Sequence, residues 1–326
     1  MLVEPLRRLA WRVRRAGLLG RPPVNEPPPG TIERFSVFDG RLHLTATIAT
    51  ATPVTTITLH LPGGDRLPCR FTAGRSSARI DQRFDLDTDA LEIASASLVL
   101  DFADGTTLRL DGLGAPLGDP AHAVSARFRH MLANAPAGTL LEVGARARSG
   151  NTRRDWVRPG WGYSGFDIAA GPNVDVVGDA HALSRHYPAE HFEAVMAFSV
   201  LEHLLMPWKF VVELNRVLKT GGIGLFTTHQ SWPVHDAPWD FWRFSDRAWA
   251  GLLNHATGFE ILDARVGEPA YLIAERCSPT TAFAERPAAY LASFVLFRKT
   301  GRTTLDWNVD LPDIIDTAYP SASERP

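Results

Sequence analysis

The sequence predicts a small all-β sandwich followed by an α/β domain with a doubly wound, mostly parallel sheet of seven strands. Three observations support this fold class. Apolar and polar residues alternate between residues 31 and 113, which is typical of strands with one buried face. Helical segments and apolar strands alternate between residues 121 and 300, which favours parallel strands. One of these strands ends in Glu142-Val143-Gly144, where a glycine turn leads into the next segment.

The N-terminal segment differs from both domains. Residues 1–20 carry apolar side chains at helical spacing, with five arginines between residues 7 and 15. We expect a basic amphipathic helix that either frays, docks on a partner, or touches an anionic membrane surface through residues 5–20. Residues 21–30 are rich in proline and predict a stiff, extended linker.

The expected sandwich domain, residues 31–113, consists of short alternating segments. Residues 41–48 and 56–61 alternate leucine and isoleucine with polar side chains. Residues 98–102 and 107–112 flank a three-residue turn that contains glycine, which predicts a hairpin. We find no catalytic cluster in this sequence and expect an accessory role for the domain.

The expected α/β domain, residues 121–300, alternates helices with apolar strands. Helices are predicted at 123–135, 206–222 and 246–258. Strands are predicted at 139–144, 163–168, 174–179, 192–199, 222–229, 259–266 and 290–299. Residues 301–326 are interpreted as a C-terminal tail that docks either on this fold or on another subunit.

Bulk composition excludes several classes of protein. The formal net charge of −2 gives no global attraction to nucleic acid. Cys69 and Cys277 lie too far apart in sequence for a zinc spacing or a disulfide framework, which favours a cytoplasmic location. No apolar run reaches the about 18 residues that a membrane span requires.

The residues that follow the strands predict a nucleotide-cofactor site, because ligands of doubly wound folds bind at the carboxyl ends of the strands. Asp167 lies about 20 residues beyond the Gly144 turn, where an acidic residue can bond the hydroxyl groups of a ribose. Asp179 ends the next strand and can accept a hydrogen bond from an amine such as that of adenine.

Two stretches resemble class I S-adenosylmethionine-dependent methyltransferases. "HFEAVMAFSVLEHLLMPWKFVVELNRVLKTGGIGLF" resembles the fourth strand, helix, tight turn and fifth strand of that family. "HQSWPVHDAPWDFWRFS" resembles the H-x-x-P-x-D-x-W-R-F segment of a type 11-like subgroup associated with glycan or small-molecule tailoring. The resemblance covers about residues 124–298 and implies a Rossmann-like fold with S-adenosyl-L-methionine as the cofactor.

The opening loop departs from the family pattern E-x-G-x-G-x-G. Only Glu142 and Gly144 match it, and Arg146 stands where a second glycine would let the backbone approach the ligand. We therefore expect the turn to run differently, with Ser149-Gly150 in that role. The residues expected to bind the cofactor are Glu142, Gly144, Ala145, Gly150, Asp167, Ile168, Asp179, Ala180 and Ser199.

The sequence predicts methylation of an oxygen or nitrogen atom of a small-molecule or glycan acceptor. The expected catalytic residues lie in the segment 229–243: His235 as the leading general base, then His229, Asp240 and Arg243. Asp240 and Arg243, three residues apart, either touch the substrate or pair with each other. His203 is either a functional residue or a packing residue. No metal ion is expected; a weak divalent-ion site at His235-Asp236 with Asp240 is the minor alternative.

Two other function classes stay open at this point. A non-catalytic scaffold with a degenerate methyltransferase fold is the first alternative. A nicotinamide-dependent oxidoreductase is the second, and the absence of a Tyr-x-x-x-Lys pair counts against it. The oligomeric state is left open.

Overall fold

The structure is a computed structural model that describes residues 31–38, 41–85, 95–111, 113, 119, 121–148, 150, 152–274, 278–279, 289–317 and 319. The chain divides into two compact units, residues 1–118 and 119–326, and each is considered by itself. The expected helix of residues 1–20, the expected linker of residues 21–30 and Cys277 lie outside the described residues.

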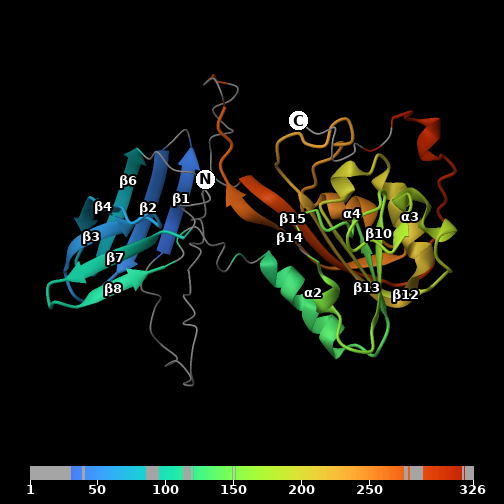
Figure 1. The fold of residues 1–326 in the computed structure, drawn as a ribbon, viewed down its shortest axis with the longest axis horizontal. Coiled ribbons are helices and arrows are strands. Elements are labelled where there is room, and N and C mark those ends of the chain that lie inside the picture. Colours follow the sequence, from blue (N-terminus) through green and yellow to red (C-terminus); the bar gives the residue numbers. More distant parts are fainter. Residues whose placement is uncertain are drawn as a thin grey trace, which may run out of the picture. The chain divides into compact units, whose positions relative to one another are not determined.

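The first unit holds two antiparallel sheets of four strands each (Figure 1). The strands of one sheet, in spatial order, are β1 (Thr31–Phe38), β2 (Arg41–Ala49), β6 (Ser77–Asp85) and β5 (Phe71–Ala73). Those of the other are β4 (Arg66–Pro68), β3 (Val54–His60), β7 (Ser97–Phe102) and β8 (Thr107–Leu110). Buried residues from both sheets form one apolar cluster, so the β-rich first domain is present as predicted.

Alternation of side chains explains why these segments form strands. In β2, every second residue is buried (Leu42, Leu44, Ala46 and Ile48), whereas the residues that alternate with them are more exposed. β7 and β8 form the predicted hairpin, and its turn is stabilised because Asp104 Oδ1 accepts a hydrogen bond from the backbone N–H of Thr106 at 3.0 Å.

The second unit is built on one seven-stranded sheet with the order β11-β10-β9-β12-β13-β15-β14 (Figure 1). The strands are β9 (Thr139–Val143), β10 (Gly162–Asp167), β11 (Val176–Val177), β12 (Phe192–Phe198), β13 (Leu218–His229), β14 (Phe259–Ala270) and β15 (Ala289–Lys299). Strands β11, β10, β9, β12 and β13 are parallel to one another, whereas β15 is antiparallel to both β13 and β14.

Helices cover both faces of this sheet. α2 (His122–Asn134) packs in one apolar cluster, which includes Leu140 of β9. α3 (Pro207–Val217) and α4 (Ala248–Leu252) contribute to a second cluster, which includes the adjacent residue Leu141. Successive residues of a strand point to opposite faces, so the two clusters lie on opposite sides of the sheet. The short 3-10 helices are η1 (Arg154–Trp156), η2 (Ala180–Arg185), η3 (Leu201–His203) and η4 (Leu311–Asp313).

Three elements are shorter than the sequence pattern predicted. α3 ends before its predicted limit because Leu218 already pairs with Phe192 in the sheet. α4 covers only part of the predicted helix 246–258, since the side chain of Asn254 bonds the carbonyl groups of its last turn. β11 has two residues of the predicted strand 174–179 because the chain turns into η2 directly afterwards.

The strand order creates a crevice beside β9. Strands β10 and β11, which follow β9 in the sequence, lie on one side of it in the sheet. The next two strands, β12 and β13, lie on its other side. The strand order therefore switches direction between β9 and β12, and ligands of such sheets bind at the carboxyl ends of the strands at this switch point.

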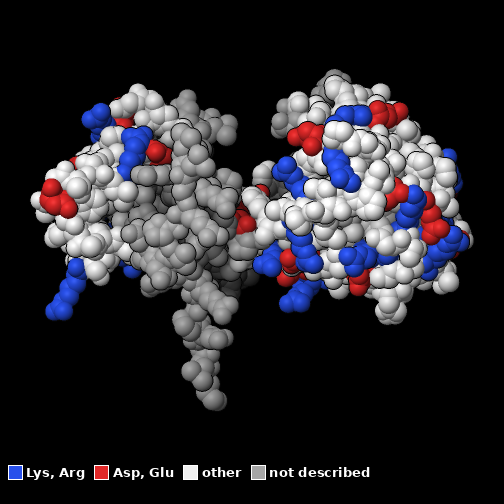
Figure 2. Space-filling model, turned by 90° about the horizontal axis from the view of Figure 1, so that it is seen from below, with Lys and Arg blue, Asp and Glu red and all other residues white. Residues whose placement is uncertain are grey.

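The described surface is of mixed charge. On the face shown in Figure 2, basic and acidic side chains of the second unit are interspersed. Among the described residues, no helix is both long and apolar enough to span a bilayer.

Candidate active site

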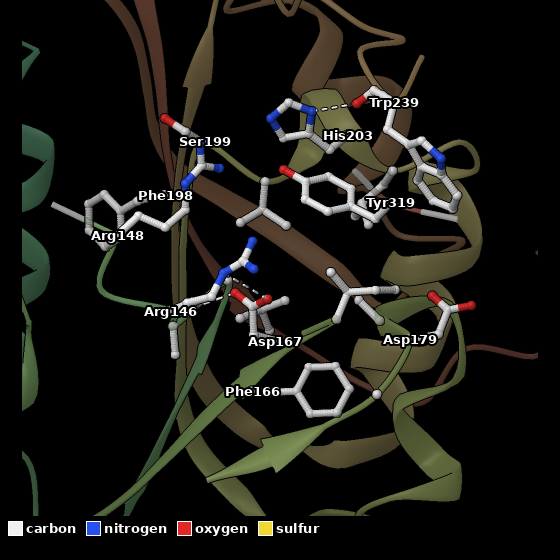
Figure 3. Close-up of a pocket in the computed structure, with 18 of the residues that line it drawn as sticks. Arg146, Arg148, Phe166, Asp167, Asp179, Phe198, Ser199, His203, Trp239 and Tyr319 are labelled. Carbon is white, nitrogen blue, oxygen red and sulfur yellow. Dashed lines mark hydrogen bonds and ion pairs between the residues drawn. The ribbon is translucent and has the colours of Figure 1, made fainter. Parts of the chain in front are cut away.

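A pocket of about 600 Å³ lies at the carboxyl ends of β9, β10 and β12 (Figure 3). Of the residues expected to bind the cofactor, the pocket is lined by Gly144, Ala145, Asp167, Ile168, Asp179, Ala180 and Ser199. The segments that follow separate strands therefore converge on one cavity, as expected when their carboxyl ends share one edge of the sheet.

Gly144 is required by the backbone at the end of β9. Its φ of +77° lies in the left-handed region, and an added Cβ would lie 2.1 Å from Cγ2 of Val200. The N–H groups of Gly144 and Ala145 both donate to the carbonyl oxygen of Phe166, at 2.8 and 3.1 Å. The loop is thereby held close against the segment after β12, and its backbone forms one wall of the pocket.

Glu142 and Gly150 do not line the pocket. Glu142 is buried, and its carboxylate accepts hydrogen bonds from the Tyr163 hydroxyl and from Arg153 Nη1, the latter at 3.2 Å. Burial raises the pKa of Glu142, although these partners oppose the rise. Its place behind the loop indicates that Glu142 positions Arg153, which does line the pocket.

Asp167 ends β10 and faces the pocket from the tip of that strand (Figure 3). Its Oδ2 accepts a hydrogen bond from the backbone N–H of Arg146 at 3.2 Å, and its Oδ1 accepts one from the N–H of Ala169 at 3.0 Å. The acidic side chain is thus fixed in place by backbone donors and presents its remaining lone pairs to a ligand.

Arg146 brings an unsatisfied donor into the pocket. Its Nε lies 3.7 Å from Asp167 Oδ1, which is too long for a hydrogen bond. Among the described residues this buried nitrogen has no hydrogen-bond partner. The sequence identified Arg146 only as a departure from a glycine pattern, whereas its side chain lines the pocket and can donate to a ligand oxygen.

Asp179 is held by the neighbouring residue His181. Asp179 Oδ1 accepts from the backbone N–H of His181 at 2.9 Å and lies 2.7 Å from its Nδ1. His181 Nε2 accepts from the N–H of Met206 at 3.2 Å, so Nδ1 carries the ring proton and donates it to Asp179. Burial opposes ionisation of Asp179, but the bonds from His181 outweigh it and lower the pKa of the carboxyl group.

Ser199 follows β12 with a φ of +52°, and its N–H donates to the carbonyl oxygen of Thr227 at 2.9 Å. This conformation is uncommon for a residue with a side chain and turns the chain sharply at the pocket. The next residue, Val200, closes against Gly144, so the two loops meet at this point.

The opposite end of the pocket is formed by His203, Trp239 and Tyr319 (Figure 3). His203 Nδ1 lies 2.5 Å from the carbonyl oxygen of Trp239, to which it can only donate. The Tyr319 hydroxyl donates to Asp236 Oδ2 at 2.8 Å, and Arg148 Nη1 reaches the same oxygen at 3.0 Å. Burial opposes ionisation of Asp236, but these donors prevail and lower its pKa.

Tyr319 reaches the pocket because the C-terminal tail docks on the second unit. Lys209 Nζ donates to Asp310 Oδ1 at 2.8 Å, and Trp239 Nε1 donates to Thr317 Oγ1 at 3.2 Å. The tail therefore docks on the α/β fold, which is the first of the two locations expected from the sequence. The sequence contains no local signal that would have assigned Tyr319 to the pocket.

The four expected catalytic residues lie close together but outside the pocket lining. Arg243 pairs with Asp240 through two hydrogen bonds of 2.5 and 2.8 Å, which is one of the two alternatives that the sequence left open. The backbone N–H of His235 also donates to Asp240, at 2.9 Å. Burial favours the neutral acid, but the bonds from Arg243 and His235 outweigh it and lower the pKa of Asp240 to about 2.

His229 is the last residue of β13. Its ring stacks on Trp232 with the ring centres 4.8 Å apart, and its Nε2 lies 3.2 Å from Glu202 Oε1. Burial, together with the nearby His235 and Arg243, lowers the pKa of His229 to about 4. His229 is therefore a neutral imidazole near neutral pH, and it contacts the pocket only through other residues.

One family model matches part of the second unit. Residues 160–226 match the family model described as a methyltransferase domain. No curated protein matches the chain.

Several solved structures resemble part of this chain. A methyltransferase-like protein from Bacillus halodurans C-125 is 15% identical, with 54% of this chain and 97% of that chain covered and a TM-score of 0.41. The 1,6-didemethyltoxoflavin-N1-methyltransferase of Burkholderia thailandensis, solved with bound S-adenosylhomocysteine, is 15% identical, with 56% and 78% covered and a TM-score of 0.40. The YcgJ protein of Bacillus subtilis is 16% identical, with 54% and 97% covered and a TM-score of 0.39.

The family match confirms the class that the sequence predicted. The second unit carries a methyltransferase domain of the S-adenosylmethionine-dependent type. The matched residues include β10, which carries Asp167, and β12, which leads to Ser199.

Proposed function

We propose that this chain transfers a methyl group from S-adenosylmethionine to an oxygen or nitrogen atom of a small-molecule or glycan acceptor. The observation that carries the proposal is the convergence of Gly144, Asp167, Asp179 and Ser199 on one pocket of about 600 Å³. Pockets for small molecules and cofactors typically occupy about 300–1,000 Å³.

The polar groups of the pocket fit the methyl donor. Asp167 would accept hydrogen bonds from the ribose hydroxyls, and Asp179, whose Oδ1 is engaged by His181, would accept from the adenine amine through Oδ2. Arg146 Nε, buried without a partner among the described residues, would donate to a ligand oxygen. When bound, the donor supplies a methyl group on a positively charged sulfur, and the protein's task is to orient the reactants.

The acceptor is assigned to the end of the pocket formed by His203, Trp239 and Tyr319. A hydroxyl or amine acceptor must lose a proton, and His203 is placed to take it. Because His203 donates its Nδ1 proton to Trp239, its Nε2 keeps a lone pair. His235, the expected base, lies behind His203 with the ring centres 4.8 Å apart, so its role in catalysis would be to support His203.

An exposed aromatic face supports a ring-shaped acceptor. Trp232 is 44% exposed although one face of its indole stacks on His229. Aromatic faces bind sugar rings and planar molecules through apolar contact. We therefore assign the outer part of the acceptor site to Trp232 and the loop that follows β13.

The test measures binding first and transfer second. We expect isothermal titration calorimetry to detect binding of S-adenosylmethionine and S-adenosylhomocysteine at one site per chain, and none of a nicotinamide dinucleotide. Radiolabelled methyl donor is then incubated with panels of sugars, phenols and amines, and labelled products are sought by chromatography. If the chain binds neither S-adenosylmethionine nor S-adenosylhomocysteine, the proposal is contradicted. If it binds them but transfers the methyl group to no acceptor, a non-catalytic role is favoured.

A further inference from the structure

A cluster of histidines and one glutamate lies beside the cofactor pocket. Glu202 and His203 belong to η3 after β12, His229 ends β13, and His235 lies in the following loop. One ligand atom from each of Glu202, His203 and His235 lies within 4.8 Å of the other two. The cluster forms because β12 and β13 are parallel neighbours whose carboxyl ends meet at one edge of the sheet.

Glu202 is fully buried, and only one of its two carboxylate oxygens has a hydrogen-bond partner among the described residues. Its Oε2 accepts a hydrogen bond from Thr228 Oγ1 at 2.5 Å. Its Oε1 has no hydrogen-bond partner among the described residues, and His229 Nε2, at 3.2 Å, lacks the orientation to supply one. No described Lys or Arg pairs with this carboxyl group within 4.0 Å. A buried acidic oxygen without a partner is costly, and a bound cation would remove that cost.

The two nearby histidines are oriented as metal ligands usually are. His203 donates from Nδ1 to the carbonyl oxygen of Trp239. His235 Nδ1 lies 3.2 Å from the carbonyl oxygen of Pro233 and 3.2 Å from Asp240 Oδ2. Metal-bound histidines typically donate their second ring N–H to a carbonyl or carboxylate group, which fixes the tautomer. In both rings the lone pair is thereby left on Nε2.

We propose that Glu202, His203 and His235 bind a divalent transition-metal ion of the zinc type. Two imidazoles and one carboxylate form a known donor set of zinc sites that keep one position open for another ligand. Tetrahedral ligands with bonds of about 2.0–2.1 Å stand about 3.4 Å apart, so the ion would draw these atoms together by about 1 Å.

The position of the ion gives it a role in methyl transfer. Only this role rests on the proposed function; metal binding itself does not. His203 also lines the pocket, so the ion would lie at the border between the cofactor and the acceptor. A metal ion lowers the pKa of a hydroxyl group that it binds. With the ion bound, His203 would act as a ligand of the ion, and removing the ion would leave His203 as the base and slow methyl transfer.

Binding is tested with Co²⁺, whose visible absorption reports its ligands, on the full chain after treatment with a chelator. We expect one Co²⁺ per chain, displaced by Zn²⁺. His235→Ala and Glu202→Gln should each weaken binding about tenfold or more, in line with the effect of changes around metal ligands. His255→Ala, which removes an exposed histidine outside the cluster, should leave binding unchanged.

His235 lies in a loop, so its variant stays informative even if Glu202→Gln fails to fold. The inference is overturned if the full chain binds no Co²⁺ in a one-to-one ratio, or if His235→Ala binds it as tightly as the wild type. Calorimetry with S-adenosylhomocysteine on the metal-free chain tests the proposed function separately. Cofactor binding without metal binding contradicts the metal site alone.

Discussion

The backbone N–H of Arg146 donates to Asp167 Oδ2 across 3.2 Å and ties the loop after β9 to the end of β10. A loop that lacks the usual second glycine is thereby held in a defined conformation at the pocket. Ala169 bonds the other oxygen of Asp167, so backbone donors orient the carboxylate before any ligand arrives. An acid fixed in this way loses little freedom when it binds ribose hydroxyls.

Asp167→Ala should weaken binding of S-adenosylhomocysteine at least about tenfold, because hydrogen bonds to charged groups contribute about 1.5–3 kcal/mol each. Calorimetry measures the dissociation constant. Asp155→Ala is the matched control, since Asp155 is exposed, lies outside the pocket lining and carries the same charge. If the Asp167 variant and the wild type bind S-adenosylhomocysteine with equal affinity, Asp167 does not bind the cofactor.

Gly144→Ala should lower both the melting temperature and the cofactor affinity. The left-handed backbone costs an alanine about 1–2 kcal/mol, and the new Cβ would also meet Val200 Cγ2 at 2.1 Å. Thermal unfolding followed by circular dichroism measures the change, with a shift of about 2–4 °C per kcal/mol for a domain of this size.

Gly150→Ala separates the cost of the left-handed backbone from the cost of the contact with Val200. Gly150 has a φ of +80°, but no atom of the described residues lies within 4 Å of an added Cβ, so only the backbone cost applies. We expect a smaller loss than in Gly144→Ala, and we expect Val200→Ala to recover part of the Gly144→Ala loss. Equal losses in the two glycine variants would show that contact with Val200 is unimportant.

His203→Gln should reduce methyl transfer by about 10²–10⁴-fold, the usual contribution of a positioned proton acceptor. Cofactor affinity should change much less, because the groups expected to bind the donor are untouched. His255→Gln is the comparison variant, since His255 is exposed and lies outside the pocket lining. Single-turnover rates measure transfer once an acceptor is found. A loss of only a few-fold in His203→Gln would exclude this role.

Asp310→Asn should release the C-terminal tail and weaken cofactor binding, because Tyr319 of the tail lines the pocket. Asp310 accepts from Lys209 Nζ and Arg185 Nη2, each at 2.8 Å. Hydrogen exchange of residues 305–317, followed by mass spectrometry, should increase in this variant. Asp316→Asn, at an exposed position of the same tail, serves as the control. Unchanged exchange in Asp310→Asn would mean that other contacts hold the tail.

The same ion pairs predict how tail docking depends on pH. The bonds from Lys209 and Arg185 lower the pKa of Asp310 to about 2. A carboxyl group whose pKa is lower when docked stabilises docking fully above the unfolded pKa near 3.9 and loses that effect as the pH falls toward 2. Exchange of the tail, corrected for intrinsic rates, should be constant from pH 8 to about pH 5 and rise below about pH 4. A rise between pH 7 and 6 would require another titrating group.

Local patterns in the sequence were sufficient for the fold class and for most of the cofactor pocket. The apolar strands, the glycine turn at Gly144 and the acids that follow the strands can be recognised without tertiary information. Parallel strands bring their carboxyl ends to one edge, so Asp167, Asp179 and Ser199 were expected to converge, and they line one pocket. Glu142 and Gly150, chosen by the same reasoning, do not line it, and the buried carboxylate of Glu142 is bonded to Tyr163 and Arg153 instead.

The tertiary structure decided which residues form the proposed acceptor side of the pocket. Tyr319 lies 83 positions from Asp236 in sequence, yet its hydroxyl donates to that residue in the pocket wall. The loop after β13 turns so that His203 lines the pocket while His235 packs behind it. The period of a strand or helix depends on neighbours along the chain, whereas the direction of a loop side chain depends on packing against distant segments. The sequence by itself therefore determined the methyltransferase class and most residues of the proposed donor side, and only the packing of remote segments determined which side chains line the proposed acceptor side.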